Sequence, residues 1–254
     1  TQALVDPGSE VVVVTPIWPN LVQQSVIMGA RLKAVPLKPV NGEWVLDLQA
    51  LLSAVTPETR MLVLNAPNNP TGWTLRRDEQ QAILNHCRKT GTWILADEVY
   101  ERLYFEPTPN ACAPSFLDIA EAGDRLVVAH SFSKTFLMTG WRLGWVAAPP
   151  DVIAAVTKAH QYNIMSAPTM AQHAALEALR HGEPFVEQMR QEYDRRRQLL
   201  LKGFEELGLP CVAPQGAFYA FPSIAPTGMD AETFCERLLR EEHVAVIPGG
   251  NFGP

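Results

Sequence analysis

A lysine with aromatic neighbours follows an apolar run near the middle of the chain. Residues 126–129 are Leu, Val, Val and Ala, which predicts a buried strand, and Lys134 comes shortly after it. Ligands of open α/β sheets bind just past the carboxyl ends of strands. If Phe132 and Phe136 partly shield Lys134 from water, its pKa falls, which favours the neutral amine that forms a Schiff base with a carbonyl. A single lysine after a strand is nevertheless more often a solvated surface residue.

Hydroxyl and guanidinium groups surround this lysine in the sequence. Ser131, Ser133 and Arg142 fall within the same twelve residues. Hydroxyl donors and a guanidinium fork together suit an anionic phosphate. Taken alone, Arg142 is more often a salt-bridge partner, so the hypothesis of a phosphate site depends on the combination.

Polar side chains also follow two other predicted strands. Asp97 comes directly after the apolar run 92–96, Tyr100 follows three residues later, and Asn69 follows the run 61–64. A carboxylate at the end of a fully apolar strand is costly unless it is paired, although a salt bridge or a helix cap would satisfy it. The amide of Asn69 can donate a hydrogen bond to a ligand oxygen, but its proline-rich surroundings also fit a plain turn.

Trp18 lies in a turn that two prolines constrain. Residues 11–14 are four valines, which predicts a buried parallel strand, and Pro16 and Pro19 fix the turn that follows. Trp18 would then project near the end of a strand. The residues alone do not distinguish this arrangement from a core aromatic.

The lysine segment resembles the signature of the class I/II aminotransferases, which are fold type I enzymes dependent on pyridoxal phosphate (PLP). That signature is Ser-x-Ser-Lys followed by Gly-x-Arg-x-Gly. Here it is matched by Ser131, Ser133, Lys134, Gly140, Arg142 and Gly144. Three further motifs of the family occur in the family's order: Asn-Pro-Thr-Gly at 69–72, Asp-Glu-x-Tyr at 97–100 and Pro-x-Gly-x-Phe-Tyr at 214–219. The resemblance therefore covers essentially the whole chain.

The resemblance implies roles for the residues that would hold the cofactor ring. Lys134 would hold PLP as a Schiff base and then shuttle a proton. Asp97 would pair with the ring nitrogen and keep it protonated, which makes the ring a strong electron sink. Tyr100 and Asn69 would bond the phenolic oxygen, and Trp18 would stack on the ring.

The resemblance also implies the phosphate and substrate contacts. Ser131, Ser133 and Arg142 would bind the cofactor phosphate, while Trp18 and Asn69 would also contact the substrate. In the family, the arginine that clamps the substrate α-carboxylate lies past the last residue of this chain. A further phosphate-binding loop and a helix of the dimer interface lie before Thr1. We therefore expect a fragment that lacks both ends.

The implied reaction moves an amino group from an L-amino acid to a 2-oxo acid such as 2-oxoglutarate. The same ring-holding residues would also serve a PLP-dependent C–S β-lyase or an enzyme like aminocyclopropane-carboxylate synthase, and the motifs cannot separate these reactions. A different class, the PLP-sensing domain of a transcription regulator, would carry a helix-turn-helix domain in front. The identity of the amino donor stays open.

Composition limits the possible partners and the location. Of the 254 residues, 47% are hydrophobic and 19% are charged, and the net charge of −6 argues against a nucleic-acid surface. No apolar run is long enough to span a membrane. Metal-ligand spacing is lacking among the four cysteines, and Cys87 and Cys235 fit buried free thiols in a reducing cytoplasm. The expected partners are an amino acid, a 2-oxo acid and, from the resemblance, a second copy in a homodimer.

Strands and helices alternate along the first part of the chain, which is typical of a parallel sheet. The resemblance implies a three-layer α/β/α large domain at 1–190, with a mostly parallel sheet, and a partial α+β small domain at 191–254. Asp47 and Asp151 are expected to cap helices, and residues 183–207 to form one long helix. The alternating pattern of residues 214–221 predicts a strand.

Overall fold

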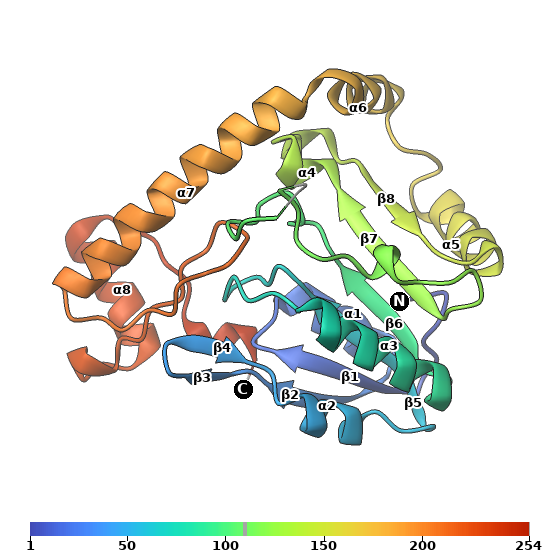
Figure 1. Ribbon diagram of the computed structural model, residues 1–254, viewed down its shortest axis with the longest axis horizontal. Helices are drawn as coiled ribbons and strands as arrows, with labels where there is room; N and C mark the ends of the chain where they lie inside the picture. The colour runs from blue at the N-terminus through green and yellow to red at the C-terminus, as the bar shows by residue number, and fades with distance from the viewer. Residues whose placement is uncertain (109–110, 254) are drawn as a thin grey trace.

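The fold is built on a central, mostly parallel sheet. A computed structural model describes residues 1–108 and 111–253, and within them the main sheet has six strands (Figure 1). Neighbouring strands are parallel, except that the last pairs antiparallel with the strand beside it. In sheet order the strands are β2 (Arg31–Pro36), β1 (Glu10–Thr15), β5 (Thr59–Asn65), β6 (Trp93–Asp97), β7 (Leu126–Ser131) and β8 (Gly144–Ala147). A separate hairpin joins β3 (Lys38–Val40) to β4 (Glu43–Val45).

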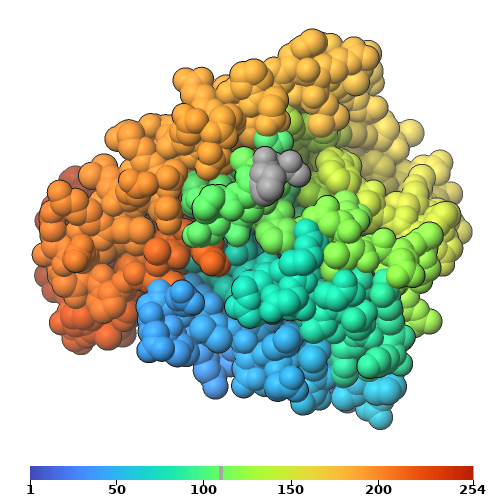
Figure 2. Space-filling model, in the orientation of Figure 1, coloured from blue at the N-terminus to red at the C-terminus, as the bar shows by residue number. Residues whose placement is uncertain are grey.

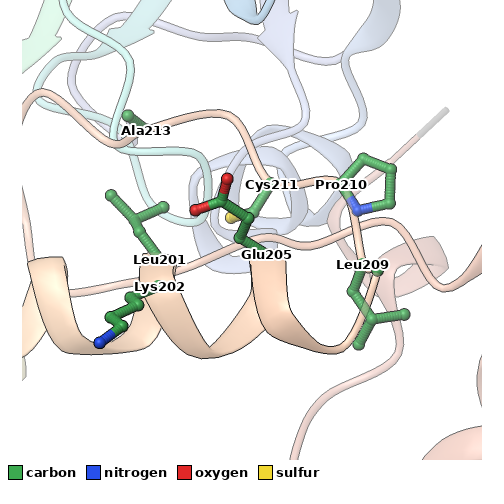
Figure 3. Close-up of a pocket in the computed structure, with 8 residues that line it drawn as sticks. Leu201, Lys202, Glu205, Leu209, Pro210, Cys211 and Ala213 are labelled. Atoms are coloured by element: carbon green, nitrogen blue, oxygen red, sulfur yellow. The ribbon is translucent and has the colours of Figure 1, made fainter.

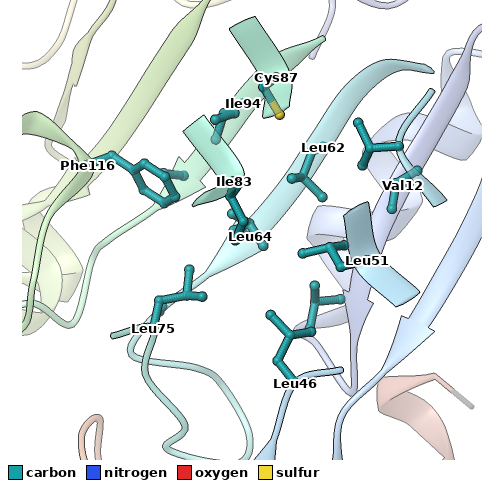
Figure 4. Close-up of a cluster of buried hydrophobic side chains, with 14 of the residues drawn as sticks. Val12, Leu46, Leu51, Leu62, Leu64, Leu75, Ile83, Cys87, Ile94 and Phe116 are labelled. Carbon is teal, nitrogen blue, oxygen red and sulfur yellow. The ribbon is translucent and has the colours of Figure 1, made fainter. Parts of the chain in front are cut away.

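The sheet is buried on both faces because its central strands are continuous apolar runs. Val12 and Val14 pack on one side with α2 (Leu48–Ala54) and α3 (Arg77–Thr90), in the cluster that Figure 4 shows. Alternate residues of the same strand, such as Val11 and Val13, face the other side, in a cluster that includes side chains of α1 (Pro19–Ile27) and α5 (Pro150–Asn163). This arrangement confirms the predicted three-layer α/β/α organisation.

The helix caps were only partly predicted. Asp47 caps α2 as expected, because the backbone N–H of Ala50 donates to its carboxylate over 2.9 Å. The predicted cap at Asp151 is wrong. Here α5 begins at Pro150, whose fixed φ suits the first helical position, and Pro149 is the capping residue without a side-chain bond. Asp151 therefore lies inside the first turn.

The C-terminal part begins with two consecutive helices, α6 (Thr169–His181) and α7 (Glu183–Glu206). The long helix predicted over residues 183–207 is thus confirmed. In the space-filling view α6 and α7 form one edge of the molecule, next to the segment around residue 105 (Figure 2). Arg102 is paired there with Glu183 of α7, and Arg190 donates to the carbonyl of Tyr104. The remaining elements are the short helix α4 (Phe132–Thr135), α8 (Ala231–Glu242) and the 3₁₀ turns Phe116–Asp118, Thr139–Trp141, Ala225–Thr227 and Gly249–Phe252.

The predicted strand over residues 214–221 is wrong. Only isolated bridges occur in this part of the described chain, between Tyr104 and Gly216 and between Cys211 and Pro222. The backbone of Gln215 and Gly216 instead donates to the carbonyl of Gly72, and this local contact replaces a strand ladder. The burial expected for Cys235 is also wrong, because α8 has no buried residue and Cys235 is only partly covered.

The 214–217 loop is clamped between two other segments. The amide of Phe105 donates to the carbonyl of Gln215, and the amide of Ala217 donates to the carbonyl of Leu103. On the other side Gly72, with φ of 71°, lies so close that a Cβ placed on it would be 2.2 Å from Cβ of Pro214. This clamp fixes the aromatic residues that follow the loop.

Candidate active site

Three adjacent strands deliver polar residues to one edge of the sheet. Asn65 at the end of β5 is in register with Asp97 at the end of β6, and Asp97 is in register with Ala129 of β7. The side-chain amide of Asn65 donates from Nδ2 to the backbone carbonyl of Asp97 over 3.1 Å. Since these strands are parallel, the residues that follow them meet at the carboxyl edge.

Lys134 lies on α4 (Phe132–Thr135), a single helical turn that directly continues β7. Its Nζ is 5.7 Å from the ring centre of Tyr100 and 5.4 Å from that of Phe218. The expectation that Phe132 and Phe136 enclose it is wrong, because these rings stack on each other at 5.6 Å. Burial lowers the pKa of Lys134, and the nearby positive charge of Arg142 lowers it further. The shielding was predicted correctly, but it comes from distant segments.

Asp97 is a buried carboxylate at the carboxyl edge. Burial raises its pKa to about 6, against the hydrogen bond from the Val99 amide and the attraction of His130, which both lower it. That hydrogen bond, from the Val99 amide to Oδ1, is 3.3 Å long. The charge of Lys134 is a minor influence, so the two residues do not form a tight ion pair.

Asn69 and Tyr100 present polar atoms beside this carboxylate. The backbone N–H of Asn69 donates to Oδ1 of Asn65 over 2.7 Å. The side-chain Oδ1 of Asn69 is buried without a hydrogen-bond partner among the described residues. The hydroxyls of Tyr100 and Tyr219 lie 2.6 Å apart. Burial raises the pKa of Tyr100 strongly, with Tyr219 adding to the shift, so the phenol stays protonated.

Two aromatic residues of this site received no role in the sequence analysis. Phe218 and Tyr219 form edge-on contacts with Tyr100, and Phe218 also lies over Lys134. The signal that could have found them is the Pro-x-Gly-x-Phe-Tyr motif itself. Its contact with Tyr100 depends on the clamp described above, which connects residues more than one hundred positions apart.

The proposed phosphate-binding residues lie around Lys134. Ser131 caps α4, since its Oγ accepts from the amide of Ser133 over 3.1 Å. Arg142 has a left-handed backbone with φ of 53°, and its Nη1 donates to the carbonyl of Thr139 over 2.7 Å. The guanidinium remains exposed and acts electrostatically on Lys134. Ser131, Ser133 and Arg142 are therefore near the lysine, as the sequence suggested.

Trp18 is the candidate residue with the fewest contacts to the other candidate residues in the described structure. It caps α1 at the carboxyl end of β1, and 42% of its surface is exposed. Within the described chain it has no ring contact or hydrogen bond with Lys134, Asp97 or Tyr100. Its indole is accessible at the correct edge of the sheet, but stacking on a ligand stays a prediction.

A separate surface pocket lies at the end of α7 (Figure 3). It is formed by α7 residues such as Leu201 and Glu205 together with the segment through Cys211. None of the candidate residues lines it, so the chemistry of the carboxyl edge does not involve this pocket.

Comparison with known proteins identifies the family. A family model described as aminotransferase class I and II matches residues 1–253. The chain is 41% identical to a putative aminotransferase of Bacillus subtilis and 39% identical to an aspartate aminotransferase of Pyrococcus horikoshii. These alignments cover 100% and 99% of the chain. The chain spans 64% of the length of each of these two relatives.

Solved structures show the same similarity. An aromatic aminotransferase from Pyrococcus horikoshii superposes with a TM-score of 0.92 at 37% identity, over 99% of this chain and 67% of that one. The aspartate aminotransferase from Thermus thermophilus crystallised with maleate gives a TM-score of 0.92 at 37% identity, over 99% of this chain and 64% of its own. The chain belongs to the class I and II aminotransferases, a PLP-dependent family of fold type I.

The residues at the carboxyl edge fit PLP. The orphaned Oδ1 of Asn69 and the protonated hydroxyl of Tyr100 offer an acceptor and a donor for polar ring substituents. Asp97 is a buried anion suited to a protonated ring nitrogen, and Lys134 is an amine whose lowered pKa favours the nucleophilic form. The fit depends on the chemistry of these atoms and not on a cavity of a given shape.

Proposed function

We propose that the protein to which this chain belongs is a PLP-dependent aminotransferase that moves an amino group from an L-amino acid to 2-oxoglutarate. The observation that supports it best is the position of Lys134 Nζ, between the rings of Tyr100 and Phe218 at the end of β7, with a lowered pKa. The names of the similar proteins, which include aspartate and aromatic aminotransferases, support transamination over the β-lyase and synthase alternatives.

In this proposal the residues of the chain divide the work. Lys134 would be the residue that holds the cofactor as a Schiff base, and its Nζ would also accept and return the proton at the substrate Cα. Bound PLP supplies an electron-accepting ring that stabilises negative charge at that carbon. Asp97 would hold the proton on the ring nitrogen, Tyr100 and Asn69 would bond the phenolic oxygen, and Trp18 would stack on the ring.

The remaining contacts belong to the same proposal. Ser131, Ser133 and Arg142 would bind the phosphate, since hydroxyls and a guanidinium bind phosphate oxygens well. Asn69 and Trp18 would also contact the substrate.

The organisation of the protein is also a proposal. Residues 1–190 would form the PLP-binding domain and residues 191–254 part of a smaller domain, with α7 linking the two. A homodimer and a cytoplasmic location would fit the family resemblance and the cysteine pattern. In the part of the chain that the structure describes, no helix combines the length and apolarity needed to cross a membrane.

Borohydride reduction tests the proposal directly. The protein is incubated with PLP, reduced, digested and analysed by peptide mass spectrometry, together with Lys134→Ala and with Lys158→Ala as the control. Lys158 is an exposed lysine of α5 outside the site. We expect the reduced adduct on Lys134 in the natural protein and in the control, and its loss in Lys134→Ala. An adduct of equal yield in Lys134→Ala would falsify the assignment.

An amine-donor screen then tests the reaction. Formation of glutamate from 2-oxoglutarate supports transamination and identifies the donor. Release of ammonia without any acceptor would instead indicate an elimination reaction on the same residues.

A further inference from the structure

The side chain of Asn65, at the end of β5, links two of the candidate residues to each other. Its Nδ2 donates to the backbone carbonyl of Asp97 over 3.1 Å, and its Oδ1 accepts from the backbone N–H of Asn69 over 2.7 Å. Only 2% of Asn65 is exposed, so both hydrogen bonds are shielded from water. One buried side chain therefore connects the end of β6 to the loop that carries Asn69.

The two backbone groups that Asn65 contacts require an amide at this position. A carbonyl accepts a hydrogen bond and an N–H donates one, so the side chain between them must offer a donor and an acceptor at the same time. An ionised aspartate has nearly the same shape, but it would direct an oxygen at the carbonyl of Asp97. An apolar residue would offer a partner to neither group. The residue type at position 65 thus follows from the two groups that it connects.

Two prolines make the loop that carries Asn69 dependent on this side chain. Pro67 and Pro70 have no N–H group to donate, so the loop cannot be held by a regular series of backbone hydrogen bonds. The N–H of Asn69 lies between these prolines and is satisfied by Asn65. Asn65 therefore fixes the backbone directly at the residue whose side chain belongs to the site.

The position of the Asn69 side chain depends on that backbone. Its Oδ1 is buried without a hydrogen-bond partner among the described residues. Burial raises the pKa of Tyr100, and a hydrogen bond with the Asn69 side chain opposes that rise, so the two candidate residues are also in contact. A shift of the Asn69 backbone would displace these polar atoms relative to Asp97, and small displacements of positioning groups are costly.

We propose that Asn65 is a positioning residue, whose side-chain amide fixes Asn69 relative to Asp97. It thereby sets the separation between the group that meets the phenolic oxygen of the cofactor and the group that meets its ring nitrogen. This inference rests on the proposed function. Both polar atoms of Asn65 are engaged within the fold, so its effect on cofactor binding passes through Asn69.

A double-mutant cycle on PLP affinity tests this role. Dissociation constants are measured by spectroscopic titration, at a temperature where each variant is folded, for the natural protein, Asn65→Ala, Asn69→Ala and the double variant. We expect each single change to weaken binding about tenfold, and the double variant to bind about tenfold weaker instead of about a hundredfold. The reason is that Asn69→Ala keeps the backbone N–H that bonds Asn65 but removes the side chain that Asn65 positions.

Gln80→Ala is the matched control for the loss of a buried amide. Gln80 of α3 is 1% exposed, and its side chain donates to the Pro114 carbonyl and accepts from Arg77, neither of which is a candidate residue. This variant should lower the free energy of unfolding and leave the affinity for PLP unchanged. If Asn65→Ala does not fold, Asn65→Ser takes its place in the cycle, because the shorter side chain cannot reach both partners.

The possible outcomes separate the two proposals. An additive loss in the double variant, unchanged affinity in Asn65→Ala or equal weakening in Gln80→Ala would show that Asn65 only stabilises the fold, and would overturn the inference. A protein that binds PLP with the expected coupling but does not transaminate would refute the proposed function and leave the role of Asn65 in place. Transamination without the coupling would do the reverse, and a natural protein that did not bind PLP would overturn both.

Discussion

In the cofactor-free protein, Asp97→Asn should increase stability at neutral and alkaline pH. Burial raises the pKa of Asp97 to about 6, so the folded state binds a proton more readily than the unfolded state does. A group with a raised pKa in the folded state contributes its full stabilisation at pH values below its pKa in the unfolded state. This contribution is lost as the pH rises through its pKa in the folded state. Above about pH 6 the buried carboxylate is therefore a cost that asparagine, which is neutral and nearly the same size, does not have.

The size of the effect follows from the shift. A rise from 3.8 to about 6 corresponds to an upper value of about 3 kcal/mol in the free energy of unfolding. Urea unfolding curves at pH 8, 6 and 4 should show this gain for Asp97→Asn at pH 8, a smaller one near pH 6 and almost none at pH 4. Cofactor should reverse the order, because the variant lacks the carboxylate that would pair with the ring nitrogen.

A second buried aspartate is the matched control. Asp97 and Asp124 are both 7% exposed, but Asp124 forms two hydrogen bonds of 2.6 and 2.7 Å with Arg88, and these lower its pKa. Asp124→Asn should therefore destabilise the protein at neutral pH, with the loss disappearing as the solution is acidified. If Asp97→Asn also destabilised the cofactor-free protein at pH 8, the fold would stabilise the ionised carboxylate of Asp97. The burial cost that we assign to this carboxylate would then be wrong.

Two further predictions concern the clamp and the tyrosine pair. Gly72→Ala should lower the free energy of unfolding by roughly 2–4 kcal/mol, because it combines left-handed backbone strain with a close approach to Pro214. Gly228→Ala is the control, since Gly228 has a φ of 69° with open space around it, and this variant should cost only about 1–2 kcal/mol. Equal losses in thermal or urea unfolding would contradict the packing of this loop. Tyr100→Phe should weaken PLP binding roughly tenfold, because it removes a hydrogen bond to the ligand. Tyr219→Phe removes a hydrogen bond that competes for the Tyr100 hydroxyl, so it should leave the affinity for PLP unchanged or raise it. A spectroscopic titration that shows equal weakening in both variants would exclude this competition.

The central strands could be predicted from the sequence because their signal is local. The valine run at 11–14 and the run at 61–64 are buried on both faces, and continuous apolar runs of this length are typical of parallel strands. The similar runs at 92–96 and 126–129 place Asp97 and Lys134 at strand ends, and parallel topology then brings them to one edge. This much of the site needs no knowledge of tertiary contacts.

The surroundings of Lys134 could not be predicted in the same way. Its nearest sequence neighbours, Phe132 and Phe136, stack on each other, and the rings that it faces belong to Tyr100 and Phe218. The 214–221 segment shows the same limit, since its alternating pattern favours a strand while hydrogen bonds to Gly72 hold it as a loop. Contacts between distant segments override a local pattern in both cases.

Asp97 and Lys134, the two ionisable groups at the centre of the site, do not form a tight ion pair. If Asp97 and Lys134 formed an ion pair, their attraction would lower the pKa of the acid and raise that of the amine. The pKa of each is shifted in the opposite direction, because burial outweighs their mutual attraction. Their mutual attraction is too weak to satisfy either group, so each can bind a ligand that carries the complementary chemistry, a cationic ring nitrogen for the carboxylate and an electrophilic carbonyl for the amine. A site arranged in this way lowers the stability of the cofactor-free protein, and the gain expected for Asp97→Asn measures the part of that cost which belongs to the acid.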